Sequence, residues 1–267
     1  MKGLRVLLTG GGRGIGACIA KALVKEGCSL AICARTFTEV QAVSEQARGY
    51  SGIIHPLSCD ISNQKDVEGM IENVTNSLGG IDVLINNAAI AGPVGALETT
   101  NSDMWRQAID VNLMGAVNCS RAVLPVMKRD GGGQIINFLG AGVGWKGFEP
   151  GKTAYITSKF AVYGFTEALA NEVKDNNILV NALSPGTADT NLRGALNPDK
   201  PMEGAESTNQ VIDLVKFLLL KPSLHLTGKI LSARWDDVTK LEDQAVRLNK
   251  TSSLTLRKID DLNYFER

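Results

Sequence analysis

Short apolar runs alternate with amphipathic stretches along most of the 267 residues of the chain. Seven of these runs have the length of a buried strand and are rich in Val, Ile and Leu; they cover residues 4–8, 29–33, 52–57, 82–86, 134–138, 179–183 and 229–232. The stretches between them have helical periodicity and cover residues 15–26, 37–47, 64–78, 103–127, 153–174 and 207–219. Strands separated by helices predict βαβ units with right-handed crossovers. The fold class that we expect is α/β, a Rossmann-type doubly wound parallel sheet of about seven strands with helices on both faces.

No linker, repeat or low-complexity stretch divides the chain into two domains. We therefore expect a single Rossmann-type domain over residues 1–235. Residues 236–267 are polar and charged, and part of this segment, around 238–249, has helical character. We expect this C-terminal extension to pack on the same domain or on a partner subunit.

Composition argues against several classes of protein. Lys and Arg together number 28, as do Asp and Glu, so no global charge favours nucleic acid or an anionic membrane surface. The five cysteines are scattered without a CxxC or Cys/His cluster, and His55 and His225 are isolated, so we expect no disulfide framework and no metal site. The first apolar run is too short for a secretion signal or a membrane span. These features predict a cytoplasmic protein.

A glycine-rich turn, Thr-Gly-Gly-Gly-Arg-Gly-Ile-Gly over residues 9–16, lies between the first predicted strand and the first predicted helix. Glycines at 10, 14 and 16 permit a tight bend that brings backbone N–H groups and a helix N-terminus against an anionic phosphate pair. The spacing is neither that of a P-loop nor GxGxxG. A merely tight loop is the alternative interpretation. The residues that we expect to bind a coenzyme here are Gly10, Gly12, Arg13, Gly14, Ile15 and Gly16.

The charge after the second predicted strand bears on which coenzyme is bound. A NAD-selective site carries an acid there to accept the ribose 2′-hydroxyl, whereas this chain has Arg35. An arginine suits a 2′-phosphate, and Arg13 in the glycine turn could reach the same group. Each arginine alone is more often a solvated surface charge. Together they favour NADP(H) over NAD(H).

Six segments, in order and at similar spacing, resemble the short-chain dehydrogenase/reductase family over residues 3–233. They are Thr9-Gly10-x-x-x-Gly14-Ile15-Gly16, Cys59-Asp60-Ile61, Asn86-Asn87-Ala88-Ala89, Asn112, Tyr155-x-x-x-Lys159 and Pro185-Gly186-x-x-x-Thr190. The four-residue spacing of the tyrosine and lysine is similar to that of the carbonyl-reducing, alcohol-oxidising branch, since enoyl reductases space them wider. One departure is Ala89, where the family usually has glycine.

The resemblance implies roles for the segments that follow the predicted strands. Asp60 and Ile61 would contact adenine, and residues 86–88, including Asn87 and Ala88, would lie along the adenosine ribose. The segment that contains Pro185, Gly186 and Thr190 would hold the nicotinamide end. Each of these segments follows the carboxyl end of a predicted strand, where open α/β sheets bind ligands.

The pair Tyr155 and Lys159 carries the predicted chemistry. Four residues apart, a phenol and an ammonium lie on one face of a helix. The phenol has an unperturbed pKa of about 10, and an adjacent ammonium is expected to lower the pKa of Tyr155 toward working pH. In the family the matching lysine also binds the nicotinamide ribose, and the residue matching Asn112 helps to hold a water. A helix-interior polar residue is the alternative interpretation of Asn112.

The segment before this pair lacks a hydroxyl that the family usually has. The family places a serine near the positions of Leu139 and Gly140, yet residues 134–152 contain no Ser, Thr or Tyr. Losing one such donor costs about 10²- to 10³-fold in rate when nothing replaces it. Thr153 or a backbone N–H of residues 140–142 could replace it, or the substrate could need only the tyrosine. The alternative function is a catalytically impaired or non-catalytic nucleotide-binding relative.

Substrate specificity is expected in residues 91–97, 140–152 and 188–206, which flank the nicotinamide position. Gly140, Trp145 and Thr153 are the candidate substrate contacts, and the expected substrate is a small carbonyl compound or alcohol. The segments 103–127 and 153–174 carry more apolar surface than one buried face requires, and in family members they form the subunit interface. We therefore expect a homodimer or homotetramer. Coverage of these helices by the sheet and the C-terminal extension is the alternative.

Overall fold

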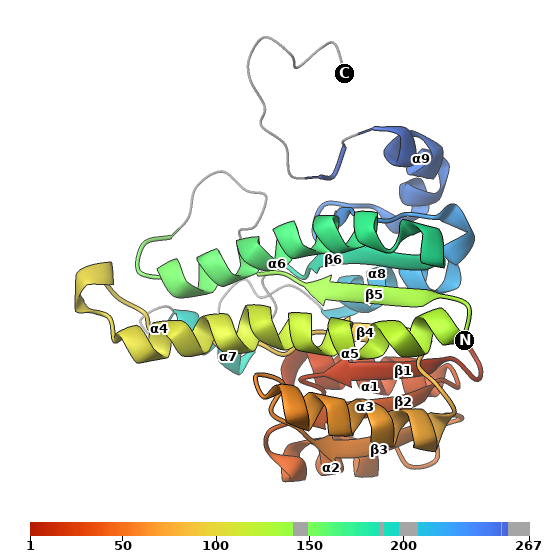
Figure 1. Ribbon diagram of the computed structural model, residues 1–267, viewed down its shortest axis with the longest axis horizontal. Coiled ribbons are helices and arrows are strands. Elements are labelled where there is room, and N and C mark those ends of the chain that lie inside the picture. Colours follow the sequence, from red (N-terminus) through yellow and green to blue (C-terminus); the bar gives the residue numbers. More distant parts are fainter. Residues whose placement is uncertain (141–148, 187–189, 198–207, 252, 256–267) are drawn as a thin grey trace.

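A parallel sheet organises the computed structural model, which describes residues 1–140, 149–186, 190–197, 208–251 and 253–255. Its strands are β1 (Arg5–Thr9), β2 (Ser29–Ala34), β3 (Ile53–Ser58), β4 (Val83–Asn86), β5 (Gly133–Phe138), β6 (Ile178–Ser184) and β7 (Ile230–Ser232). Their order across the sheet is β3-β2-β1-β4-β5-β6-β7, and every pairing is parallel (Figure 1). The predicted doubly wound α/β fold is confirmed.

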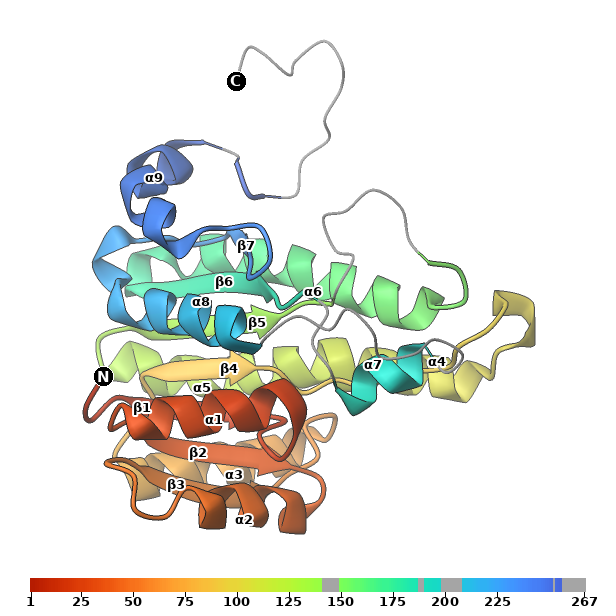
Figure 2. The ribbon, with the colours of Figure 1, turned by 180° about the vertical axis from the view of Figure 1, so that it is seen from behind.

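Helices cover both faces of this sheet. They are α1 (Gly14–Lys25), α2 (Phe37–Gln46), α3 (Gln64–Leu78), α4 (Ser102–Ile109), α5 (Gly115–Arg129), α6 (Thr153–Glu172), α7 (Asn191–Leu196), α8 (Thr208–Leu220) and α9 (Val238–Lys250). Short 3₁₀ turns are η1 (Leu97–Thr99), η3 (Lys174–Asn176) and η4 (Pro222–Leu224). Helices α3, α5 and α6 lie in front of the sheet in Figure 1, and α1, α2 and α8 cover the opposite face in Figure 2.

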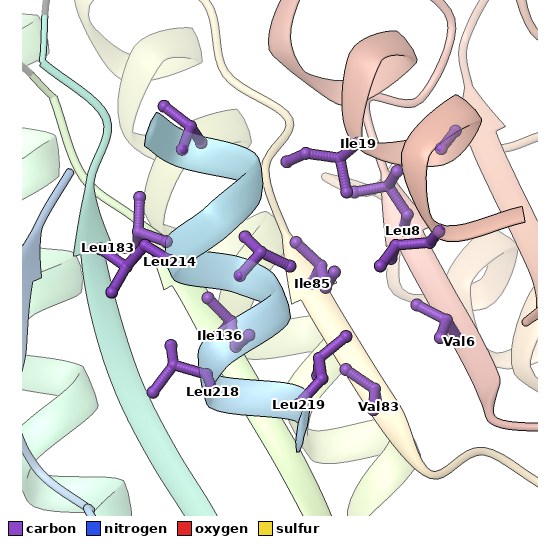
Figure 3. Close-up of a cluster of buried hydrophobic side chains, with 14 of the residues drawn as sticks. Val6, Leu8, Ile19, Val83, Ile85, Ile136, Leu183, Leu214, Leu218 and Leu219 are labelled. Atoms are coloured by element: carbon purple, nitrogen blue, oxygen red, sulfur yellow. The ribbon is translucent and has the colours of Figure 1, made fainter. Parts of the chain in front are cut away.

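The strands are nearly continuous apolar runs because both faces of the sheet are buried. On one face, Val6 and Leu8 of β1 and Ile85 of β4 pack with Leu214 and Leu218 of α8 (Figure 3). On the other face, the alternating residues of the same strands, such as Leu7 and Leu84, pack against α3, α5 and α6. This two-sided burial fixes the register of each strand, since a shift by one residue would exchange the two faces.

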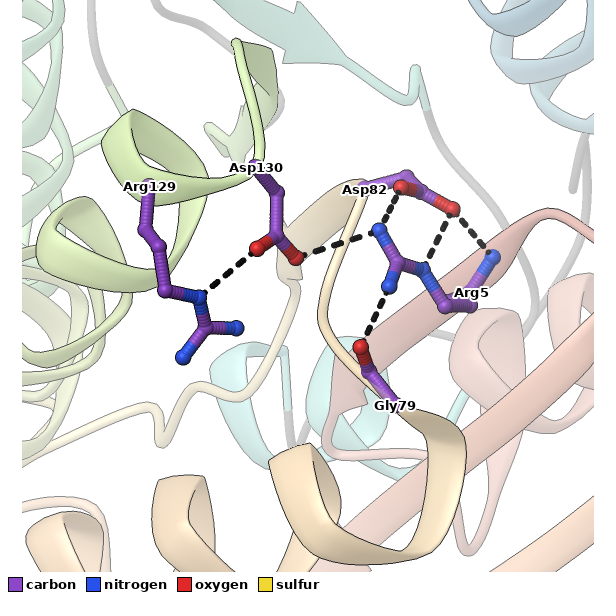
Figure 4. Close-up of polar contacts among 5 residues, drawn as sticks. All are labelled: Arg5, Gly79, Asp82, Arg129 and Asp130. Atoms are coloured by element: carbon purple, nitrogen blue, oxygen red, sulfur yellow. Dashed lines mark hydrogen bonds and ion pairs between the residues drawn. The ribbon is translucent and has the colours of Figure 1, made fainter.

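An ion-pair cluster ties the amino ends of the two central strands together. Arg5 at the start of β1 donates from its backbone N and its Nε to Asp82 Oδ2, at 2.8 and 3.0 Å, just before β4 (Figure 4). Its Nη1 donates to the carbonyl of Gly79, and Asp130 lies 3.3 Å from its Nη2. The cluster therefore stabilises the amino edge of the sheet. Ligands bind at the opposite edge in such folds, beyond the carboxyl ends of the strands.

The long helix predicted over residues 103–127 is interrupted in the structure. Helix α4 ends at Ile109, a π-helical turn η2 (Asp110–Met114) follows, and α5 continues to Arg129. A π turn widens the helix by one residue and is common near functional sites. The sequence analysis also assigned no helix to the segment that forms α7.

The C-terminal extension begins with α9, whose Leu241, Ala245 and Leu248 are buried in the cluster that contains α8. Beyond it, the backbone carbonyl of Leu254 accepts a 2.8 Å hydrogen bond from the N–H of Ile230 in the edge strand β7. The extension thus covers part of an exposed strand edge of its own domain. Residues 256–267 lie outside the described part of the chain. Within the described part, no helix has both the length and the apolar character needed to cross a bilayer.

Candidate functional site

The glycine turn and the end of β4 form one hydrogen-bonded unit at the carboxyl edge of the sheet. Asn87 donates from Nδ2 to the carbonyls of Thr9 and Gly10, at 3.0 and 3.1 Å, and its backbone N–H donates to the Thr9 hydroxyl. A Cβ at Gly16 would lie 2.1 Å from the Gly10 oxygen, so only glycine allows this approach. Gly10 itself has a φ of 67°. The turn is therefore shaped by backbone contacts that larger residues would break.

A cleft of about 410 Å³ opens over this unit, between the ends of β1 and β4 where the strand order reverses. Most of the coenzyme-binding residues predicted from the sequence line it: Gly10, Gly12, Arg13, Gly14, Ile15, Gly16, Arg35, Asp60, Ile61, Asn87, Ala88 and Thr190. The described lining does not include Pro185 and Gly186, which follow β6, or the pair Tyr155 and Lys159. The cleft thus gathers the predicted phosphate and adenosine contacts from four separate loops.

The side chains at the adenosine end carry both signs of charge. Arg13 Nη1 lies 3.4 Å from Oε1 of Glu39, a residue in the first turn of α2 that also lines the cleft. Arg35 lines the same end. Asp60 accepts hydrogen bonds from the backbone N–H and hydroxyl of Ser62, at 3.0 and 2.7 Å, which hold the loop after β3. The sequence analysis singled out both arginines and missed Glu39, because a single acid on a solvated helix face gives no signal.

Tyr155 and Lys159 lie one turn apart on α6 and are both buried, with 6% and 2% of their surfaces exposed. Lys159 donates from Nζ to the carbonyl of Phe138, the last residue of β5, at 2.8 Å. The helix therefore presents the phenol and the ammonium to the carboxyl end of β5, close to the sheet edge that carries the cleft.

Burial dominates the ionisation of Tyr155 and Lys159. It raises the pKa of Tyr155 above its usual value and lowers the pKa of Lys159 to about 8. The direction for Tyr155 is opposite to the lowering that the sequence analysis predicted from the neighbouring ammonium. The physical reason is that the phenol is removed from water, which disfavours the phenolate.

Asn112 occupies the π turn and joins three parts of the site. Its Oδ1 accepts from the N–H of Ile90 at 2.8 Å, and its Nδ2 donates to the Ile90 carbonyl at 2.9 Å. The same Nδ2 donates to Ser158 Oγ at 2.9 Å, and Ser158 donates to the Tyr155 carbonyl at 2.7 Å. Ile90 lines the cleft, so Asn112 connects the cleft wall to the helix of Tyr155.

Gly140 lies directly against the phenol. A Cβ at residue 140 would lie 2.6 Å from Cε1 and 2.8 Å from Oη of Tyr155, so the ring fills the space that a side chain would need. Thr153 is exposed at the start of α6, about 200° around the helix from the buried Tyr155. Trp145, the third predicted substrate contact, lies outside the described residues. The described residues contain no group of three or more metal-ligating side chains.

Comparison with known proteins decides the family. The family of short chain dehydrogenases matches residues 5–201. The chain belongs to this short-chain dehydrogenase/reductase family. Carbonyl reductase family member 4 of Xenopus tropicalis is 32% identical over 227 residues, covering 83% of this chain and 92% of the relative. The 3-oxoacyl-(acyl-carrier-protein) reductase of Vibrio harveyi is 31% identical over 239 residues, covering 86% and 96%.

A solved structure supports the same assignment. The 3-ketoacyl-(acyl-carrier-protein) reductase of Brucella melitensis, complexed with NADH, aligns with a TM-score of 0.77 at 26% identity, covering 86% of this chain and 96% of that one. The short-chain dehydrogenase/reductase described here is therefore an oxidoreductase that uses a nicotinamide coenzyme. Its cleft fits such a coenzyme, because the glycine turn and the N-terminus of α1 line it, where backbone N–H groups can bind a phosphate pair.

Proposed function

We propose that the protein interconverts a carbonyl and a secondary alcohol with NADP(H), using Tyr155 as the acid and base and Lys159 as its electrostatic partner. The observation that carries this proposal is the convergence of both side chains on the end of β5. Lys159 Nζ binds the Phe138 carbonyl, and Tyr155 Oη lies beside Gly140, two residues further on. A substrate oxygen at this edge would meet the phenol first.

Each residue has a distinct role in the proposed reaction. The bound coenzyme supplies or accepts the hydride, and Tyr155 donates a proton to the substrate oxygen during reduction or takes it during oxidation. Lys159, with a pKa of about 8, is largely protonated at pH 7. Its positive charge favours the phenolate that forms when the proton leaves Tyr155. Burial of both groups strengthens this effect, because charges interact more strongly away from water.

The missing serine leaves few donors for the substrate oxygen. Thr153 points away from the phenol, as described above. In the described part of the chain, no hydrogen bond engages the N–H of Gly140, which borders the Tyr155 ring. We infer that this N–H takes over the contact to the substrate oxygen, since backbone N–H donors stabilise a developing oxyanion in acyl-transfer sites.

The coenzyme preference and the partners complete the proposal. Arg13 and Arg35, both in the cleft lining, support a preference for NADP(H) through contacts to a 2′-phosphate. The substrate is a small molecule, and the balanced charge of the chain argues against nucleic acid and membrane partners. Exposed Met104 in α4 and Met114 at the end of η2 support a homodimer or homotetramer through the segment formed by α4, η2 and α5. We place the enzyme in the cytoplasm.

Turnover with a matched pair of tyrosine variants tests this proposal. Oxidation of NADPH by a panel of ketones is followed at 340 nm for the wild type, Tyr155→Phe and Tyr163→Phe. We expect Tyr155→Phe to abolish turnover while it retains NADPH binding. Tyr163→Phe makes the same chemical change at another buried position of α6 and should retain turnover. Equal turnover by Tyr155→Phe and the wild type would refute the proposed role of the phenol.

The second candidate function is a nucleotide-binding protein without turnover, which the lack of a hydroxyl over residues 134–152 favours. This alternative predicts normal NADPH binding together with no oxidation by any carbonyl compound in the panel. NADPH oxidation by the wild-type protein with the ketone panel therefore distinguishes the two functions.

A further inference from the structure

Glu39 is a charged residue of the cleft to which the proposed reaction gives no role. It is the third residue of α2, and its side chain is 33% exposed. A Cβ at Gly12 would lie 2.7 Å from the Glu39 Cβ and 3.2 Å from its Oε2, so the start of α2 packs directly over the glycine turn. The carboxylate is thereby held over the backbone that would contact the coenzyme.

Its partner is one of the two arginines on which the NADP(H) preference depends. Arg13 Nη1 lies 3.4 Å from Glu39 Oε1, and the Arg13 side chain is 62% exposed. An exposed pair of this kind is weak and can be exchanged for another anion. An incoming 2′-phosphate must therefore compete with Glu39 for Arg13.

The charges that line the described part of the cleft balance. Arg13 and Arg35 are positive, and Glu39 and Asp60 are negative. Asp60 is occupied by the hydrogen bonds from Ser62, whereas the Glu39 carboxylate faces Arg13. Glu39 is thus the acidic group that opposes a phosphate at the arginine end of the cleft.

We propose that Glu39 is a specificity-determining residue that weakens NADP(H) binding and so lets NAD(H) compete. This inference rests on the proposed function, because it assumes that the cleft binds the coenzyme. A 2′-phosphate carries about −1.5 to −2 charges at pH 7, whereas NAD(H) has a neutral hydroxyl at that position. Repulsion between the carboxylate and the 2′-phosphate therefore acts on NADP(H) alone, whereas the diphosphate bridge is common to both coenzymes and does not change the preference between them.

The expected size of the effect follows from Coulomb's law. A unit charge about 6 Å from a doubly charged phosphate in a water-like dielectric changes affinity by about tenfold. Removal of the carboxylate also frees Arg13 for the phosphate, which acts in the same direction. Because the residues are partly exposed, the effect should shrink as salt is raised above about 0.15 M, where the Debye length is about 8 Å.

The test compares Glu39→Gln with Glu45→Gln in the full-length protein. Both variants remove one negative charge from α2, but Glu45 is exposed, binds Gln41 on its own helix, and is not part of the cleft lining. Dissociation constants are measured by calorimetry for NADPH, NADH, 2′,5′-ADP and 5′-AMP at low and high salt. The two smaller nucleotides isolate the adenosine end of the site and require no turnover.

We expect Glu39→Gln to bind NADPH and 2′,5′-ADP about tenfold more tightly, with NADH and 5′-AMP changed less than twofold and Glu45→Gln like the wild type. An unchanged or weaker affinity for NADPH in Glu39→Gln would overturn the inference. A selective loss of NADH affinity would overturn it as well, because Glu39 would then be a ligand of the ribose hydroxyl. If neither coenzyme binds the wild type, the proposed function fails and this inference fails with it. If the wild type binds a coenzyme and Glu39→Gln has the same ratio of NADPH to NADH affinity, the inference alone fails.

Discussion

Substitution of Gly140 by alanine tests whether the Tyr155 ring occupies the place of the missing side chain. The new Cβ would lie 2.6 Å from Cε1 and 2.8 Å from Oη of the phenol, where ordinary contacts begin at 3.4 Å. The ring must therefore move by nearly 1 Å, although only 6% of the Tyr155 surface is exposed. Overpacking of this kind costs about 1–3 kcal/mol of unfolding free energy.

The expected result has a stability part and a catalytic part. For a chain of this size, each kcal/mol lowers the Tm by about 2–4 °C, so Gly140→Ala should lower it by at least about 2 °C. A reactive group displaced by about 1 Å can lose about 10²-fold in rate, and kcat should fall accordingly. The same argument predicts that serine at position 140 does not restore the family's arrangement without moving the phenol.

Gly164 provides the matched control on the helix that carries Tyr155. It lies inside α6, and a Cβ there would meet nothing within 4 Å. Gly164→Ala should therefore raise stability by about 0.5–1 kcal/mol through helix propensity and leave kcat unchanged. Thermal unfolding and NADPH oxidation are measured for both variants. Wild-type stability and kcat in Gly140→Ala would refute the packing argument, because the ring would then not be confined against residue 140.

Three further predictions concern the rest of the site and the extension. Asn112→Ala should cost about 1–3 kcal/mol in urea unfolding, because it removes the buried hydrogen bond to Ser158 and leaves the partly buried N–H and C=O of Ile90 without partners. Because burial lowers the pKa of Lys159 to about 8, this lysine alone contributes stability that rises between about pH 8 and 10.5 by about 3 kcal/mol at most; the difference in unfolding free energy between the wild type and Lys159→Met should change by this amount over that range. Removal of residues 251–267 should promote self-association seen by light scattering, because the N–H of Ile230 on edge strand β7 loses the Leu254 carbonyl.

The sheet could be predicted from sequence because its strands are buried on both faces. Such strands require unbroken apolar runs, so the run at 134–138 marks β5 to within one residue of Gly133–Phe138. The π turn at Asp110–Met114 could not be predicted, since the residues around it continue a helical pattern. Within the turn, Asn112 makes two hydrogen bonds to Ile90, which is 22 residues away, and a helical pattern in the sequence does not show such a contact.

The site was predictable where one residue type is required by backbone geometry or chemistry. Gly10 and Gly16 lie where the side chain of a larger residue would collide with the backbone. Tyr155 and Lys159 are four residues apart, a spacing that places both side chains on one face of a helix. Glu39 could not be found this way, because its role depends on how α2 packs over Gly12. The missing hydroxyl was visible in the sequence, but the ring that fills its place was not.

Asn112 stands in the π turn inside the long helix. From there one amide binds both the cleft wall at Ile90 and Ser158, and π turns are common near functional sites. Ser158 lies between Tyr155 and Lys159 and holds the Tyr155 carbonyl. The hydrogen bonds of one side chain therefore join the cleft wall at Ile90 to the turn of α6 that carries Tyr155.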